Sequence, residues 1–242
     1  MMFWLKKKKI VIDAFTENDI IATYPIEESS KNLPNWYKKL KPTLEVSGEG
    51  HTLNIPTFKR CDGISDLIRN SFTIPMWSDL SLAVDADGRF NWKYPSNQYN
   101  FGVDQHPEFL MDAAFSPMVH TKVMSPWLLR ETKGINFYQT QAFYSFNEFG
   151  GDVLIPPGVV NYKYQQATHI NMFVSRNKTY MFKAGQPMMY LVPMTEDKVE
   201  VKTHVVSAVE YKRILNLSAG NKFLGSYKHL KSKGLCPMSR IS

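Results

Sequence analysis

The sequence predicts a mainly β protein, with a jelly-roll or β-sandwich body, a few short helices and a basic helical C-terminal tail. The strongest evidence is the segment 152–202, where apolar and polar residues alternate between Pro, Gly and Asn-Lys punctuation. Many short strands at regular spacing are typical of sandwiches and jelly rolls. The long helical crossovers of a doubly wound parallel sheet do not occur in the sequence pattern.

Five strands are expected in and just beyond this segment, and we expect consecutive strands to fold back on one another. Asn177-Lys178 and Ala184-Gly185 are the expected turns between them. The expected strands are Val153–Ile155, Thr168–Ser175, Thr179–Lys183, Met188–Met194 and Lys198–Ser207.

Earlier in the chain, residues 9–14 are expected to form a first strand, and two hairpins are expected after it. The first hairpin turns at 85–88, where Asp and Gly supply unusual backbone angles. The second is centred on Lys133-Gly134, with arms at 127–132 and 135–143. A short helix is expected over 62–72, capped by Asp62 or Ser65, and a single helical turn over 35–40.

The positive charge is concentrated at the C-terminal end. The net charge is +7, and the residues from Tyr211 onward include seven Lys and Arg but no Asp or Glu. We therefore divide the chain into a β-rich body, 1–206, and a basic helical appendage, 207–242. A solvated helical face explains the charge most simply, and nucleic-acid binding is the alternative. The candidate contacts are Lys212, Arg213, Lys228, Lys231 and Lys233.

The cysteine content and the hydropathy pattern exclude several classes of protein. Cys61 and Cys236 lie far apart in the chain, so neither a disulfide framework nor a zinc knuckle is indicated, and a reducing compartment fits best. No run of 18 apolar residues occurs, so we expect no membrane span. The apolar run near the start is interrupted by Asp13, unlike that of a secretory signal.

Catalytic motifs are absent from the sequence, so enzyme activity is not favoured and no cofactor is expected. The patterns G-x-S-x-G, G-x-x-x-x-G-K-[ST] and G-x-G-x-x-G do not occur. His106, between Asp104 and Glu108, comes closest to a metal site, but a polar loop is the simpler interpretation. The dense aromatics of 137–149 are interpreted as sheet core or a subunit interface rather than a base-stacking surface.

Four sequence blocks together resemble an uncharacterised family of proteins encoded by tailed bacteriophages, many of them with marine or cyanobacterial hosts. The blocks are KRCDGISDLIRNSFTIPMWSDL (59–80), KVMSPWLLRETKGINFYQTQAFY (122–144), LIPPGVVNYKYQQATHINMFV (154–174) and FKAGQPMMYLVPM (182–194). The resemblance implies a phage protein that acts in the host cytoplasm or in the virion. It implies no particular activity.

The segment 154–194 is also similar to one stretch of the trimeric dUTPase and dCTP deaminase superfamily, whose fold is a β jelly roll. Gly158, Val159 and Val160 match the superfamily pattern, and its water-activating carboxylate falls on Asn161. Asn cannot act as a general base. The Ser-rich phosphate motif and the Gly-rich C-terminal motif are missing. The similarity therefore implies the architecture more than nucleotide hydrolysis.

We therefore expect a non-catalytic binding or structural protein, associated with the virion or with a host target. Homo-oligomers or other phage proteins are the expected partners. The first alternative is a nucleotide-binding or nucleotide-hydrolysing protein, with Asn161, Tyr162 and His169 as candidate ligand contacts. The second alternative is nucleic-acid binding through the basic tail.

Overall fold

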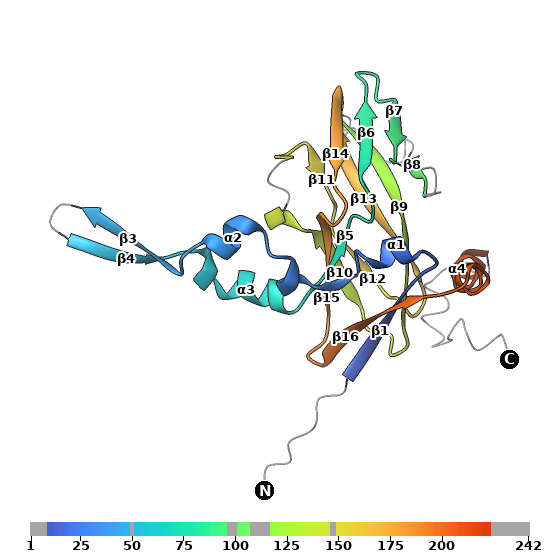
Figure 1. The fold of residues 1–242 in the computed structure, drawn as a ribbon, viewed down its shortest axis with the longest axis horizontal. Coiled ribbons are helices and arrows are strands. Elements are labelled where there is room, and N and C mark those ends of the chain that lie inside the picture. Colours follow the sequence, from blue (N-terminus) through green and yellow to red (C-terminus); the bar gives the residue numbers. More distant parts are fainter. Residues whose placement is uncertain (1–8, 49–50, 96–100, 107–116, 146–148, 224–242) are drawn as a thin grey trace, which may run out of the picture.

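The computed structural model describes residues 9–48, 51–95, 101–106, 117–145 and 149–223. The protein is mainly β, as the sequence predicts, and two larger sheets pack against each other as a sandwich (Figure 1). Side chains of both sheets meet in one core, which includes Trp127 and Ile12 from the first sheet and Phe137 and Leu191 from the second.

The first sheet has the strand order β11-β13-β9-β1-β16, and β8 also pairs with β9. β1 lies inside this sheet, antiparallel to β9 and parallel to β16. Its alternate residues Ile10, Ile12 and Ala14 are buried, as expected of a strand with one covered face. The strands are β1 (Lys9–Thr16), β8 (Val103–Gln105), β9 (Met118–Glu131), β11 (Val153–Leu154), β13 (Ala167–Ser175) and β16 (Lys198–Val205).

The second sheet has the order β12-β10-β15-β5-β2 and is antiparallel at every pairing. Its strands are β2 (Glu27–Glu28), β5 (Phe72–Pro75), β10 (Phe137–Gln141), β12 (Gly158–Val160) and β15 (Pro187–Pro193). β12 is an edge strand of this sheet.

A smaller sheet, β14-β6-β7, contains the predicted hairpin at 85–88. β6 (Leu80–Val84) and β7 (Phe90–Lys93) pair across it, and β14 (Lys178–Phe182) flanks β6. Gly88 has a φ of +81°, and the Asp85 carboxylate accepts a hydrogen bond from the Arg89 N–H at 2.8 Å. This hairpin prediction is therefore confirmed, with the turn chemistry on which it was based.

The prediction that consecutive strands fold back on one another is wrong for residues 118–205. The strands β9 to β13 alternate between the two large sheets, and β14, β15 and β16 each lie in a different sheet. The turns at Lys133-Gly134, Asn177-Lys178 and Ala184-Gly185 therefore join strands that do not pair with each other. The turn residues and the alternation of apolar and polar residues are the same in both cases: when the next strand pairs with the preceding one, and when it crosses to the facing sheet. The local sequence pattern therefore does not distinguish a hairpin from a crossing.

A two-stranded hairpin at 43–56 extends away from the sandwich (Figure 1). It consists of β3 (Thr43–Gly48) and β4 (His51–Pro56), and below we call these two strands the arm. The arm is flanked in sequence by α2 (Asn35–Lys39) and by η2 (Phe58–Arg60), which leads into α3 (Asp62–Arg69). The sequence analysis did not predict the arm.

The predicted helices at 62–72 and 35–40 are confirmed as α3 and α2. The residue at the N-cap of α3 is Cys61 rather than Asp62 or Ser65. The other helical elements are α1 (Asp19–Ala22), η1 (Ser29–Asn32), η5 (Phe143–Ser145) and α4 (Ala208–Phe223). α4 continues through Gly220 to Phe223. None of the helices in the described part of the chain is long and apolar enough to cross a bilayer.

The first turns of α4 pack against the outer face of the first sheet. Tyr211 and Ile214 are buried there against Phe15 and Leu128. The Tyr211 hydroxyl donates a hydrogen bond to the Pro126 carbonyl at 3.0 Å. The start of the basic appendage is therefore part of the packed structure.

Candidate functional site

Two of the three candidate ligand contacts, Tyr162 and His169, lie behind or on the wall of one cavity, at the border between the two large sheets. The cavity has a volume of about 270 Å³ and is open to solvent. Its wall comes from β13 of the first sheet, from β10 and β12 of the second, and from the segment between β12 and β13. The lining residues are Gln139, Val159, Val160, Gln165, Ala167, Thr168, His169 and Asn171.

Of the three candidates, only His169 lines the cavity directly. It is half-buried on β13, in register with Met124 of β9, just past an irregularity in the pairing of these strands. The irregularity puts Thr168, whose side chain is buried, and His169 side by side in the wall. β-Bulges commonly redirect side chains in this way.

Tyr162 lies behind the wall, fully buried. Its hydroxyl lies 2.9 Å from Thr168 Oγ1 and accepts a hydrogen bond from Gln139 Nε2, also at 2.9 Å. Burial raises the pKa of Tyr162 to about 12, and the hydrogen bonds with Thr168 and Gln139 moderate the rise. Tyr162 is therefore a neutral group that orients two residues of the cavity wall.

Asn161 is fully buried and holds the turn between β9 and β10. Its Nδ2 donates to the Gly134 carbonyl at 2.8 Å and to Asn136 Oδ1 at 3.1 Å. Its Oδ1 accepts a hydrogen bond from the Lys163 N–H at 3.2 Å. All three contacts are within the protein, so the residue aligned with the water-activating position of the dUTPase-like pattern has a structural role here.

The cavity wall is polar but uncharged when His169 is neutral. Two Gln, one Asn, one Thr and one His provide donors and acceptors, whereas neither Lys, Arg, Asp nor Glu is among the lining residues. Such a wall suits a neutral, hydrogen-bonding group. It offers neither the cations that would bind a triphosphate nor carboxylates that would bind a metal.

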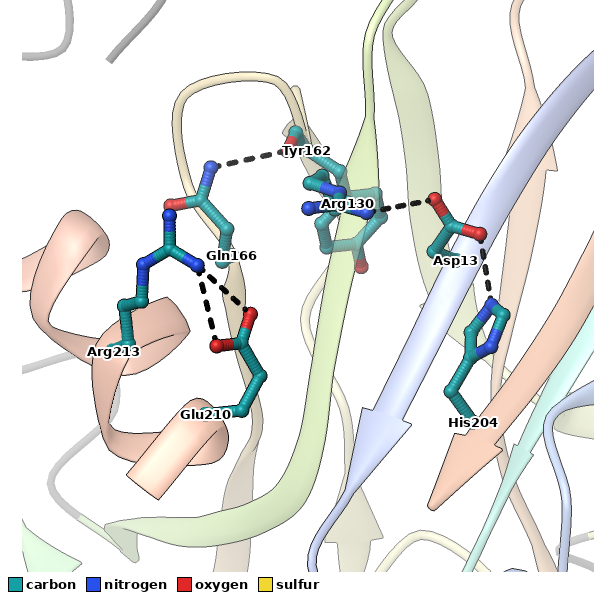
Figure 2. A network of polar contacts seen from close by, with 7 residues as sticks. All are labelled: Asp13, Arg130, Tyr162, Gln166, His204, Glu210 and Arg213. Atoms are coloured by element: carbon teal, nitrogen blue, oxygen red, sulfur yellow. Dashed lines mark hydrogen bonds and ion pairs between the residues drawn. The ribbon is translucent and has the colours of Figure 1, made fainter. Parts of the chain in front are cut away.

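A second polar cluster lies on the outer face of the first sheet, beside α4 (Figure 2). Asp13 lies between two partners, with one carboxylate oxygen 3.3 Å from Arg130 Nη2 and the other 2.9 Å from His204 Nε2. Phe15 contacts both partners, because its ring stacks on His204 and the Arg130 guanidinium lies over it at 4.8 Å. The cluster joins β1, β9 and β16 across three neighbouring strands.

Two of the five candidate nucleic-acid contacts lie in the described part of the chain. Lys212 and Arg213 are exposed on α4, and the Arg213 guanidinium pairs with Glu210 at 3.3 Å, as Figure 2 shows. Lys228, Lys231 and Lys233 lie outside the described residues.

Around His106, the described part of the chain forms a stack of rings. The ring of His106 stacks on His120 at a centroid distance of 4.4 Å, and His120 stacks on Phe173 at 4.7 Å. Glu108 lies outside the described residues. Among the residues that the structure describes, no group of three or more His, Cys, Asp or Glu is arranged to hold a metal ion.

We predict that His120 makes the protein less stable in mild acid. Burial disfavours its charged form, and the neighbouring His106 adds repulsion, so the pKa of His120 lies below its usual value. The unfolded chain therefore binds this proton more tightly, and stability falls as the pH drops below about 6.5. Replacing His120 with Phe, which preserves the stack, should flatten this decline.

Urea unfolding of the wild type and of His120→Phe between pH 5 and pH 8 measures how the unfolding free energy changes with pH. His51→Gln, at an exposed position on β4, is the matched control and should retain the slope of the wild type. Equal slopes for all three proteins would show that His120 does not contribute to the acid sensitivity.

No protein-family model matches the chain, and none of the curated proteins matches it. The cavity, the cluster around Asp13 and the arm are therefore the features from which a function has to be inferred.

The arm is the candidate functional feature that the sequence analysis missed. Leu44, Val46, Leu53 and Ile55 alternate with polar residues along two runs on either side of a Gly-containing turn. This is an ordinary hairpin signal. It predicts a strand pair but gives no indication that the pair stands apart from the body.

Proposed function

We propose that the protein is a phage-encoded, non-catalytic binding or structural component that works as an oligomer, in the virion or on a host target. The phage assignment is supported by the four sequence blocks alone. The binding role is supported chiefly by one structural observation, the arm. It carries four aliphatic side chains that are each about half exposed or more. Exposed, contiguous apolar surface of this kind is typical of interaction sites.

Mass spectrometry of purified virions tests the virion form of the proposal. The chain should be detected in a reproducible copy number relative to the major capsid protein. If virions lack the chain, that form is wrong, and affinity purification from infected cells then tests for a host target. A protein that is monomeric in solution and recovers no defined partner from either source would contradict the proposal as a whole.

Nucleotide binding is the second candidate, and the neutral cavity beside Tyr162 and His169 favours it. The wall can form hydrogen bonds with a base or a sugar, but it has no Lys or Arg side chain that could bind phosphates. A ligand that binds only the folded state raises the melting temperature by mass action. A nucleoside should therefore shift the melting temperature as much as its triphosphate does, and His169→Ala should remove the shift. Flat melting curves with every nucleoside and nucleotide would exclude this function.

Nucleic-acid binding through the tail is the third candidate, supported by the exposure of Lys212 and Arg213. It predicts an affinity that falls steeply with salt. The deletion should begin at residue 224 rather than 211, because removing Tyr211 and Ile214 would uncover Phe15 and Leu128. If deleting 224–242 and replacing Lys212 and Arg213 by Gln leave DNA and RNA retention unchanged, this candidate is wrong.

A further inference from the structure

The arm has one apolar and one polar face, as its strand register shows. Leu44 pairs with Ile55 and Val46 pairs with Leu53, so all four side chains project from the same side. His51, opposite Gly48, lies on this side at the tip. The other side carries Thr43, Glu45, Ser47, Thr52, Asn54 and Pro56. We call the first side the aliphatic face of the arm.

The aliphatic face is exposed to solvent in the described structure. Leu44 and Val46 are each 48% exposed, Leu53 is 63% exposed and Ile55 is 47% exposed. The arm points away from the sandwich, and each of its strands contacts chiefly the other (Figure 1). A two-stranded hairpin alone is marginally stable in water, so the face needs a second layer.

The base of the arm is held in a fixed arrangement. The Thr57 N–H donates to the Pro42 carbonyl at 3.0 Å, and the Thr57 hydroxyl donates to the Lys41 carbonyl at 2.5 Å, which closes the hairpin below its last strand pair. α2, just before the arm, is tied to the body where the Trp36 indole N–H donates to the Tyr144 carbonyl at 2.9 Å. The arm is therefore an anchored projection and presents its aliphatic face in a defined direction.

We propose that the aliphatic face is covered by the same face of a second copy of this chain, so that two arms pack face to face about a two-fold axis. This inference rests on the proposed oligomeric function and identifies the surface that forms the oligomer. Two such hairpins form a two-layer sandwich about 10 Å thick, with side chains from both inner faces interdigitating.

The composition of the two faces favours a second copy as the occupant. Apart from His51 at the tip, the aliphatic face consists of uncharged aliphatic side chains, so two identical faces meet without charge repulsion between them. The arm's acidic side chain in the described strands, Glu45, lies on the opposite face and stays in water when the arms pair. In an antiparallel arrangement of the two arms, the tip of one lies over the base of the other, which separates the two His51 rings.

The exposed area indicates a reversible dimer. Half-exposed aliphatic side chains present on the order of 80 Å² each, so four of them contribute roughly 300 Å² per arm. Both arms together then bury well under the ~1,200–2,000 Å² of a stable interface. We therefore expect a monomer–dimer equilibrium with a Kd in the range of about 10–100 µM rather than an obligate dimer.

Sedimentation equilibrium from about 1 to 200 µM, a range that brackets this Kd, tests the proposal. The wild type should shift from the mass of one chain toward that of two. Leu53→Glu, which places a carboxylate in the aliphatic face, should remain at one chain at every concentration. Thr52→Glu is the matched control, because it adds the same charge at the neighbouring residue on the polar face, opposite Ser47. It should dimerise like the wild type.

A mixing experiment distinguishes arm-to-arm pairing from an arm that docks elsewhere on its neighbour. Tagged wild-type protein should capture untagged wild type but not untagged Leu53→Glu. If the arm instead bound the body of the next copy, Leu53→Glu would still accept a wild-type arm and would be captured. Thermal melting of both variants should match the wild type, because the arm lies outside the core.

Three results would overturn the inference: a wild type that stays monomeric throughout, a Leu53→Glu variant that dimerises normally, or capture of that variant by the wild type. In the last two cases the protein still assembles, so the proposed function survives while the assigned surface is wrong. If the protein is monomeric and no partner is recovered with it from virions or infected cells, both the assigned surface and the proposed function are wrong.

Discussion

Replacing Glu131 with Ala should destabilise the protein by about 2–4 kcal/mol, which is a large fraction of the stability of an average domain. Glu131 is the last residue of β9 and is only 1% exposed. Its carboxylate accepts hydrogen bonds from the backbone N–H groups of Lys133, Gly134 and Ile135, the last two at 2.6 Å and 3.1 Å. Without the carboxylate, these three N–H groups would have to form hydrogen bonds with water, at a turn that is half-buried.

Urea unfolding at pH 7 measures the loss, and Glu45→Ala provides the matched control. Glu45 has the same side chain but is exposed on the polar face of the arm, so its removal should change the unfolding free energy by less than about 0.5 kcal/mol. If the two variants lose the same stability, the carboxylate of Glu131 does not hold the turn.

Replacing Asn161 with Asp should also destabilise the protein, by about 2–4 kcal/mol at pH 7. The Asn161 amide nitrogen donates to two acceptors, the Gly134 carbonyl and Asn136 Oδ1. A carboxylate would instead place negative charge against both oxygens in a fully buried position. The substitution restores the residue type of the dUTPase-like pattern, but the expected result is a weakened turn rather than an activated water.

The pH dependence of this loss identifies its cause. The buried Asp would hold its proton more tightly in the folded protein than in the unfolded chain, so its folded pKa would be raised. The stability difference from the wild type should therefore shrink as the pH falls from 7 to 4, since the protonated acid donates one hydrogen bond again. Asn161→Ala provides the comparison, and its deficit should not depend on pH. A deficit of Asn161→Asp that is constant with pH would contradict the electrostatic explanation.

Most strands could be predicted from the sequence because their signals are local. Residues 168–175 and 188–194 alternate or form short apolar runs between turn residues, and they form β13 and β15 within one residue of the expected bounds. The helix at 62–72 was recognisable from Ile64 and Ile68, which are buried on one side of α3 as its amphipathic pattern requires.

The pairing of the strands could not be predicted, because it depends on contacts between distant residues. Gly134 has a φ of +83°, which fits a tight hairpin turn as well as it fits a crossing between sheets. Its N–H bonds to Glu131 and its carbonyl to Asn161, and the Asn161 contact spans 27 positions in the chain. Nothing in the short pattern around Lys133-Gly134 identifies that partner.

The candidate site was foreseen only in part, for a similar reason. His169 was selected for its place on an expected strand, and it does line a cavity. Gln139 and Thr168 are ordinary strand residues in the sequence. They become part of the site because strands of the two sheets bring them to the same cavity wall, where the buried Tyr162 hydroxyl contacts both. The arm is exposed because no other part of the described chain packs against its aliphatic face. A local sequence pattern does not show which distant segments will cover a hairpin.

The position of β1 inside the first sheet has a consequence for how the chain folds during synthesis. β1 pairs with β9 on one side and with β16 on the other, where Lys9 lies opposite Lys198. At ~5–20 residues per second, a ribosome needs about 10–40 s to make the intervening chain. Throughout that interval the sheet that buries Ile10 and Ile12 is incomplete. Strand pairings between residues far apart in the chain, such as that of β1 with β16, also form slowly. The late capture of this first strand is therefore a step at which a nascent chain is exposed to aggregation with its neighbours.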